Sequence, residues 1–249
     1  MSRWTLSPDF AQGATARAFA DLDHVFALEG TPITAAPMSE VIRIELDGHR
    51  YYVKRYTGAG KNPLRRWFAR PRVQLEWENL QRFARWGIPT ARIAGFGLER
   101  KAGSFVRGAM ITQEIPATAD LATLADKQDP RLANAAWVDA VSRQLAAITR
   151  TLHAQRFAHN DLKWRNILVT EGDAPQVFLI DCPAGMHWIE PFLSHRIIKD
   201  LATLDKVAQH QLSRSQRLRF YHRYTGRPRL NTADRKRVRK VLRYFEGRE

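Results

Sequence analysis

Two short motifs near the middle of the chain carry side chains that could move a phosphoryl group. The first is His-Asn-Asp-Leu-Lys-Trp-Arg-Asn at residues 159–166, and the second is an apolar run that ends on Asp181. Asp161 offers a carboxylate that can orient a hydroxyl nucleophile, and Lys163 would lie near the transferred phosphate. Asn166 and Asp181 offer an amide and a carboxylate to Mg²⁺, which prefers oxygen ligands. Together these residue types indicate phosphoryl transfer to a hydroxyl.

The residues after the first motif predict a hairpin that brings the two metal ligands together. Residues 167–169 are typical of a short strand, 171–173 of a turn, and 176–180 of the return strand. This arrangement places Asp181 at a strand end beside Asn166, where both side chains can reach one cation. The alternative is a surface loop with solvated charges, and five polar positions in this order argue against it.

These motifs give the chain a resemblance to the protein-kinase-like superfamily. Within it the chain is similar to the small bacterial lipopolysaccharide core kinases, the heptose and Kdo kinase group with its InaA-like members. The resemblance covers roughly residues 40–225 and is strongest at the catalytic-loop motif. It implies a two-lobed α+β fold, with a small β-rich N-terminal lobe at 1–115 and a mostly helical C-terminal lobe at 116–249. The weaker matches are Val53-Lys54, Glu76, Asp181 and residues 199–204.

A lysine on a predicted strand is the candidate for holding the nucleotide phosphates. Alternating residues predict strands at 41–46 and 50–56, joined by the tight-turn pair Asp47-Gly48. Lys54 lies on the second strand, and the resemblance implies that it binds the α- and β-phosphates of ATP. The alternative is an edge-strand lysine without a catalytic role.

The partner of Lys54 is expected on the helix predicted at residues 74–86, whose apolar side chains share one face. Kinases pair this lysine with a glutamate on the following helix, and the predicted helix offers Glu76 and Glu78. We prefer Glu76, because Glu76 with Leu80 four residues later resembles the family's helix pattern. A solvated position on the helix surface is the alternative.

Two more strands are predicted at residues 92–99 and 108–115. By resemblance, the end of the second strand is the hinge between the lobes. Backbone groups of Gln113 and Ile115 would then face the adenine edge of ATP. An ordinary strand end is an equally good interpretation.

The C-terminal half contains the strongest helical pattern, at residues 131–156, and this helix leads into the catalytic loop. His159 is expected to brace that loop and not to act as a base. Asp200 is expected at the start of a helix, where a carboxylate can cap free N–H groups. The resemblance implies instead that Asp200 is a buried brace, hydrogen-bonded to the catalytic loop.

The charge balance indicates an anionic partner. The chain has 40 Lys and Arg against 25 Asp and Glu, a net charge of +15. Such a field attracts nucleic acid, anionic lipid headgroups or a phosphorylated glycolipid. Residues 232–245 predict a basic amphipathic helix. It could lie on a membrane surface or pack on the C-terminal lobe, and these two roles are compatible. A second basic cluster comprises Lys54, Arg55, Lys61, Arg65, Arg66, Arg70 and Arg72.

Hydropathy and cysteine content favour a cytoplasmic protein. No apolar run has the length of a membrane-spanning helix, and residues 1–9 lack the apolar stretch of a secretory signal. Cys182 is the only cysteine, which agrees with a reducing compartment. With the resemblance, we expect a cytoplasmic enzyme that is peripheral at the inner face of the inner membrane.

Several departures from the protein-kinase pattern argue against a protein substrate. Asn160 replaces the arginine that commonly receives an activation-loop phosphate. Asp181 is followed by Cys182-Pro183, and proline fixes its φ angle, so an in/out flip should be restricted. Eighteen residues separate Asp181 from Asp200, which leaves little room for a peptide-binding platform. No glycine-rich phosphate loop precedes residue 41, so another loop must cover the phosphates.

The resemblance implies an ATP- and Mg²⁺-dependent kinase that phosphorylates a hydroxyl of a lipopolysaccharide inner-core sugar. Asp161 would accept the hydroxyl proton, and Lys163 would neutralise charge on the moving group. Asn166 and Asp181 would hold Mg²⁺. The alternatives are an atypical protein kinase and a non-catalytic basic protein, either a pseudokinase or a nucleic-acid binder. The sequence contains no recognition helix and no aromatic stacking motif typical of nucleic-acid binding.

Overall fold

The computed structural model describes residues 2–58 and 70–247, and the chain divides into two compact units. Unit 1 comprises Met1–Arg82 with Ala91–Ile115, and unit 2 comprises Phe83–Thr90 with Pro116–Glu249. Part of the predicted basic cluster, namely Lys61, Arg65 and Arg66, lies outside the described residues.

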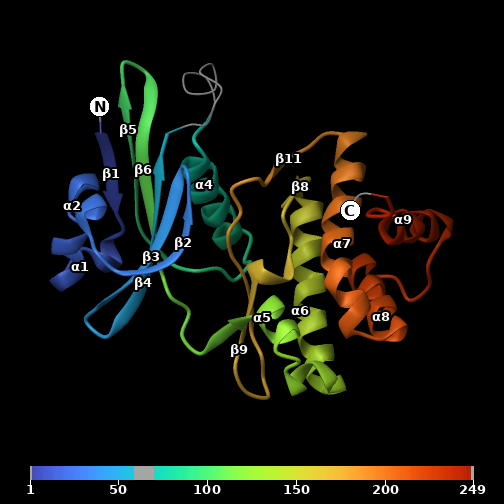
Figure 1. Ribbon diagram of the computed structural model, residues 1–249. Helices are drawn as coiled ribbons and strands as arrows, with labels where there is room; N and C mark the ends of the chain where they lie inside the picture. Colours follow the sequence, from blue (N-terminus) through green and yellow to red (C-terminus); the bar gives the residue numbers. More distant parts are fainter. Residues whose placement is uncertain (1, 59–69, 248–249) are drawn as a thin grey trace. The chain divides into compact units, whose positions relative to one another are not determined.

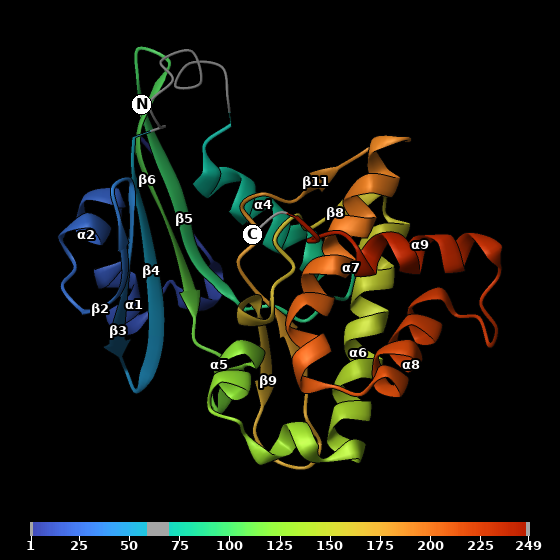
Figure 2. The same cartoon turned by 45° about the vertical axis from the view of Figure 1, so that its right-hand side comes forward.

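Unit 1 is built on a six-stranded antiparallel sheet (Figures 1 and 2) with the order β1-β5-β6-β4-β3-β2. In the predicted β3–β4 hairpin, Leu46 lies opposite His49, and Asp47 and Gly48 have positive φ angles of 51° and 73°. An Asp-Gly pair favours this two-residue turn, so the turn sets the register of the strand that carries Lys54. The strands are β1 (Ser2–Leu6), β2 (Thr31–Ala36), β3 (Ser39–Leu46), β4 (His49–Thr57), β5 (Ile93–Lys101) and β6 (Ser104–Gln113).

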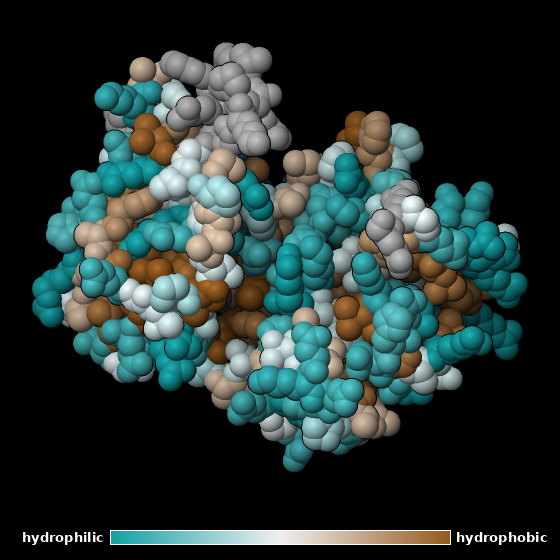
Figure 3. Space-filling model, viewed as in Figure 1, coloured by the Kyte–Doolittle hydropathy of each residue, from teal (hydrophilic) through white to brown (hydrophobic). Residues whose placement is uncertain are grey.

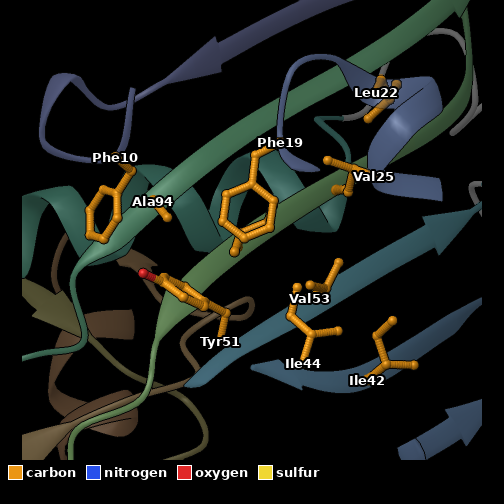
Figure 4. Packing of buried hydrophobic residues seen from close by; sticks show 11 residues of the cluster. Phe10, Phe19, Leu22, Val25, Ile42, Ile44, Tyr51, Val53 and Ala94 are labelled. Carbon is orange, nitrogen blue, oxygen red and sulfur yellow. The ribbon is translucent and has the colours of Figure 1, made fainter. Parts of the chain in front are cut away.

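The core of unit 1 lies on one face of this sheet (Figure 4). Three short helices precede β2 and cover that face: η1 (Pro8–Phe10), α1 (Gly13–Ala18) and α2 (Leu22–Ala27). The ring of Phe19 meets Tyr51 edge-on, with 5.3 Å between the ring centroids. These helices and β1 could not be predicted from local patterns, because elements of six residues or fewer show too little periodicity.

Alternation along β4 separates this core from a polar face. Tyr51 and Val53 are buried in the core, so Lys54 and Tyr56 project from the opposite face of the strand. The helix α4 (Arg72–Arg85) carries the partner of Lys54. It begins two residues before the predicted start at residue 74 and ends one residue before the predicted end at residue 86.

Unit 2 is mainly helical, with the long helices α6 (Ala135–Ala154) and α7 (Phe192–Gln211) (Figures 1 and 2). Two small antiparallel sheets, ordered β10-β9-β7 and β11-β8, flank the catalytic motif. The remaining helices are α5 (Leu121–Asp126), η2 (Pro130–Ala133), η3 (Trp164–Asn166), α8 (Arg214–Thr225) and α9 (Thr232–Leu242). The strands are β7 (Thr118–Asp120), β8 (Phe157–Ala158), β9 (Ile167–Thr170), β10 (Val177–Leu179) and β11 (Met186–His187).

The C-terminal helix packs on unit 2 through its apolar side. Val238 and Val241 of α9 lie against a buried cluster that includes Leu201 of α7 and Tyr221 and Tyr224 of α8. Packing on the C-terminal lobe is therefore one role of this helix, and the basic side chains occupy its other faces. The helix ends at Leu242, three residues before the predicted end.

Ion pairs within unit 2 neutralise part of the positive charge in residues 214–243. Arg223 contacts Asp139 of α6 at 2.7 Å, and Arg227 contacts Asp234 at 2.9 Å. The Arg223 guanidinium lowers the pKa of Asp139 to about 2. The first pair joins α8 to α6 and the second joins the α8–α9 connection to α9. The formal charge therefore overstates the free positive field of this region. Within residues 2–58 and 70–247, no helix is both long enough and apolar enough to cross a membrane.

Candidate active site

A buried aspartate fixes the entrance to the catalytic loop. Asp200 is fully buried in α7, and its two carboxylate oxygens accept the N–H groups of His159 at 2.7 Å and Asn160 at 2.8 Å. Asn160 has a φ angle of 64°, in the left-handed region that asparagine tolerates better than most residues. The expectation that Asp200 caps a helix start is wrong, because α7 begins at Phe192. The buried brace implied by the family resemblance is confirmed.

The sequence did not reveal the residues that hold Asp200 in place. His153 of α6 lies with Nε2 3.4 Å from the Asp200 carboxylate, and its Nδ1 lies 2.8 Å from the hydroxyl of Tyr224 in α8. His153 therefore links the Asp200 carboxylate of α7 to the Tyr224 hydroxyl of α8. These side chains are far apart in sequence, so no local pattern could have identified them.

Asp161, the carboxylate predicted to meet a substrate hydroxyl, is partly exposed. Its side chain is 27% exposed, with Lys163 Nζ 2.6 Å away and Arg165 Nη2 3.6 Å away. Burial favours a higher pKa for Asp161, but the hydrogen bond and charge of Lys163, with the charge of Arg165, hold the pKa below its usual value. Asp161 is therefore a carboxylate at neutral pH, ready to accept a hydrogen bond from a hydroxyl group.

The predicted hairpin places Asn166 and Asp181 at one end of a strand pair. β9 and β10 are antiparallel with Leu179 opposite Ile167, and the N–H of Ile180 donates to the Asn166 carbonyl at 3.0 Å. Asp181 follows directly, with a φ angle of 58° in the left-handed region. Sparsely populated backbone conformations of this kind cluster at functional sites.

The donor atoms at this end suit a magnesium ion bound together with a nucleotide. The side-chain nitrogen of Asn166 donates to the Asp161 carbonyl at 2.8 Å, so its amide oxygen would be the atom offered to a cation. The described residues contain no group of three or more His, Cys, Asp or Glu side chains placed to hold a metal. Asn166 and Asp181 would therefore need phosphate oxygens to complete the coordination, which is how Mg²⁺ is usually bound.

His159 is a structural residue of the loop. Its ring is fully buried and stacks on Phe83, with 6.0 Å between the ring centroids. Burial lowers the pKa of its imidazole, so the ring is neutral at physiological pH. This agrees with the expectation that His159 braces the loop.

In unit 1, Lys54 and Glu76 form the predicted ion pair. Lys54 Nζ lies 2.9 Å from the nearer carboxylate oxygen of Glu76, and the Glu76 side chain is 3% exposed. Tyr56, which the sequence analysis did not select, donates its hydroxyl to Glu76 Oε2 at 2.7 Å. Tyr56 and Lys54 are two residues apart on one strand, so the period of a strand could have suggested that they share a face.

The suggested hinge residues lie at the end of β6 and just beyond it. The N–H of Gln113 already donates to the Arg92 carbonyl at 2.9 Å, so the predicted contact with adenine would have to come from its carbonyl. Ile115 is the last residue of unit 1 before the chain enters unit 2.

This fold and these residues define a protein-kinase-like phosphotransferase. The model of the lipopolysaccharide kinase (Kdo/WaaP) family matches residues 27–224. A solved structure described as "WaaP in complex with acyl carrier protein" shares the fold, with a TM-score of 0.73 and 22% sequence identity over 99% of this chain and 97% of that chain. No match was found among the curated proteins.

The chain belongs to the lipopolysaccharide kinase (Kdo/WaaP) family. It is accordingly a lipopolysaccharide core kinase, a phosphotransferase that acts on core sugars. The family, the kinase-like α+β fold and the lipopolysaccharide kinase function predicted from the sequence are confirmed. Membership of a kinase family also implies the use of ATP.

Proposed function

We propose that Asp161 is the base that orients and deprotonates the acceptor hydroxyl of an inner-core sugar. The observation that carries this proposal is an ionised, partly exposed carboxylate with Lys163 at 2.6 Å. Lys163 would then release Asp161 to the hydroxyl and neutralise charge on the phosphoryl group in transfer.

The same proposal assigns the nucleotide contacts. Lys54, held by Glu76, would bind the α- and β-phosphates of ATP, and backbone groups of Gln113 and Ile115 would bind adenine. Asn166 and Asp181 would hold Mg²⁺, which would neutralise charge on the phosphates. The amide oxygen and the carboxylate supplied by this pair support the metal assignment.

Purified protein, ATP, Mg²⁺ and a delipidated core oligosaccharide test the catalytic assignment. The wild type should add one phosphate, detected by mass spectrometry. Asp161→Ala should lower turnover at least about 10²-fold, the scale of general-base catalysis, while nucleotide binding persists. More than half of the wild-type turnover in this variant would refute the role of Asp161. Phosphorylation of proteins but not of core saccharides would refute the acceptor.

We also propose that acyl carrier protein binds this chain, as it does in the similar WaaP structure. A specific observation favours this partner. Unit 2 contains an apolar cavity of about 540 Å³ among α6, α7, α8 and α9, large enough to receive part of an acyl chain. Its lining includes Val141, Leu145, Leu204, Ala208 and Val238. Ala208→Trp should fill the cavity and abolish the thermal stabilisation that acylated carrier protein gives. Equal stabilisation of the variant and the wild type would exclude the cavity as the binding site of the acyl chain.

We place the enzyme in the cytoplasm, at the inner face of the inner membrane. The net charge of +15 would draw it to anionic lipids, each basic residue near the surface contributing about 1 kcal/mol. Replacement of Arg237, Arg239, Lys240 and Arg243 by glutamine should therefore weaken co-sedimentation with anionic vesicles, most clearly at low salt. Unchanged co-sedimentation would limit α9 to its packing role.

A further inference from the structure

The segment between Asp181 and α7 ends in an exposed hydrophobic tip. Ile189 is 69% exposed and Phe192 is 59% exposed, the highest values for large hydrophobic residues in the described part of the chain. Met186, in the same segment, is 42% exposed. Figure 3 shows hydrophobic side chains at the projecting end of the β11–α7 connection. We call residues 186–192 the β11–α7 tip.

The tip is held in shape by backbone bonds at both ends. β11 pairs with β8, and the N–H of Trp188 donates to the Arg156 carbonyl at 2.9 Å. At the other end, the N–H of Leu193 donates to the Ile189 carbonyl at 2.9 Å. Ile189 and Phe192 are therefore presented to solvent by a fixed backbone.

The base of this segment is attached to the catalytic loop. β8, the partner of β11, immediately precedes His159. The side chain of Asn160 donates to the Ala184 carbonyl at 2.9 Å. Whatever the tip binds is thereby kept in a fixed relation to the loop that carries Asp161.

A cationic side chain packs against the tip, and a second lies further along α7. The Arg196 guanidinium lies 4.4 Å from the centre of the Trp188 ring, and Lys199 follows one turn later on α7. Glu190 is the one acidic residue between Asp181 and Asp200, and its carboxylate accepts the N–H of Ser194 at 3.2 Å. Exposed apolar side chains beside cations match the headgroup and upper acyl region of an anionic bilayer.

We propose that the β11–α7 tip inserts into the surface of an anionic lipid bilayer and holds the catalytic loop against it. This inference rests on the proposed function, in which the acceptor sugar belongs to a lipid-anchored molecule. A protein partner fits the tip less well, because a stable interface buries about 800 Å² on each side, whereas this surface is a narrow projection.

Fluorescence tests the insertion directly. Cys182 is the only cysteine and is fully buried, so Ile189→Cys provides one accessible thiol for a polarity-sensitive dye. Vesicles of equal parts phosphatidylethanolamine and phosphatidylglycerol should shift the emission of this dye to shorter wavelength. The control is Ile33→Cys, on β2 of unit 1, where the native residue is 44% exposed; its emission should stay unchanged. No shift at position 189, or an equal shift at both positions, would overturn the proposal.

Activity separates this inference from the proposed function. The double variant Ile189→Ser/Phe192→Ser should bind these vesicles about tenfold more weakly and phosphorylate a vesicle-borne acceptor correspondingly less. It should retain wild-type activity on the delipidated oligosaccharide. Ile33→Ser/Met38→Ser, which removes two exposed hydrophobic residues from unit 1, should behave as wild type in each assay. Equal loss on both acceptors, or full vesicle binding by the tip variant, would overturn the inference. Failure of the wild type on the soluble acceptor would overturn the proposed function itself.

Discussion

Removing one hydroxyl should show how the Lys54–Glu76 ion pair depends on Tyr56. Tyr56→Phe deletes the hydrogen bond to Glu76 Oε2, 2.7 Å long, and leaves the ring in place. A hydrogen bond to a charged group contributes about 1.5–3 kcal/mol, and about 1.4 kcal/mol corresponds to a tenfold change in an equilibrium. Since Glu76 orients the lysine that would hold the ATP phosphates, we expect the KM for ATP to rise about tenfold. The turnover number should change little, because a ground-state contact is lost.

Steady-state kinetics with varied ATP, together with thermal unfolding, measures this effect. Loss of the bond should also lower the Tm by about 2–4 °C per kcal/mol for a chain of this size. Tyr51→Phe is the matched control, because Tyr51 is buried on the same strand and its hydroxyl makes no hydrogen bond to any described residue. If Tyr56→Phe lowers the Tm but leaves the KM for ATP at the wild-type value, Tyr56 only stabilises the fold and the reasoning fails.

Three further substitutions address the catalytic loop and the strand end beside it. Asp181→Asn keeps the shape of the side chain but removes its charge, so Mg²⁺ should enhance nucleotide binding less than in the wild type; equal enhancement in titrations with and without Mg²⁺ would exclude the metal role. Lys163→Ala removes the main cation that lowers the pKa of Asp161, so the acidic limb of the pH profile of kcat/KM should move to higher pH. If the acidic limb does not move, its titration belongs to a group other than Asp161. Burial depresses the pKa of His159 in the folded state, below an unfolded value of about 6.5. The stabilisation that neutral His159 contributes is therefore present above about pH 6.5 and is lost as the pH falls toward the folded-state pKa. Between about pH 7 and about pH 5, the Tm of His159→Phe should decline less than the Tm of the wild type. Parallel declines of the two proteins would show that another group titrates.

Local patterns predicted those parts of the site whose members are close in sequence. The 159–166 motif and the strand after it indicated the hairpin, and strand alternation with the following helix indicated the pairing of Lys54 with Glu76. The two side chains are 22 residues apart, and α4 is the next helix after β4 among the described residues. The catalytic roles assigned to these residues stay predictions.

Contacts between segments that are distant in sequence could not be predicted. The side chain that contacts Asp200 is His153 of α6, which is itself held by Tyr224 of α8. The position of Asp200 inside α7 was misjudged because a carboxylate before an apolar run is also typical of a helix start. The short helices before β2 cover the sheet through a few aromatic and aliphatic residues, such as Phe10 and Phe19. Their burial depends on the completed sheet, and no periodic pattern in the sequence predicts it.

The bond between Asp200 and the catalytic loop also orders events during synthesis of the chain. The carboxylate is 41 residues after His159 and 40 after Asn160, so a ribosome has produced the whole catalytic motif before its brace exists. Unit 1 can complete its lysine–glutamate pair from residues that emerge much earlier, since domains fold as the N-terminal parts become available. The Lys54–Glu76 pair can thus form before the 159–166 loop is fixed by Asp200. A nascent or truncated chain that ends before α7 contains the full signature motif but lacks the carboxylate that fixes this loop.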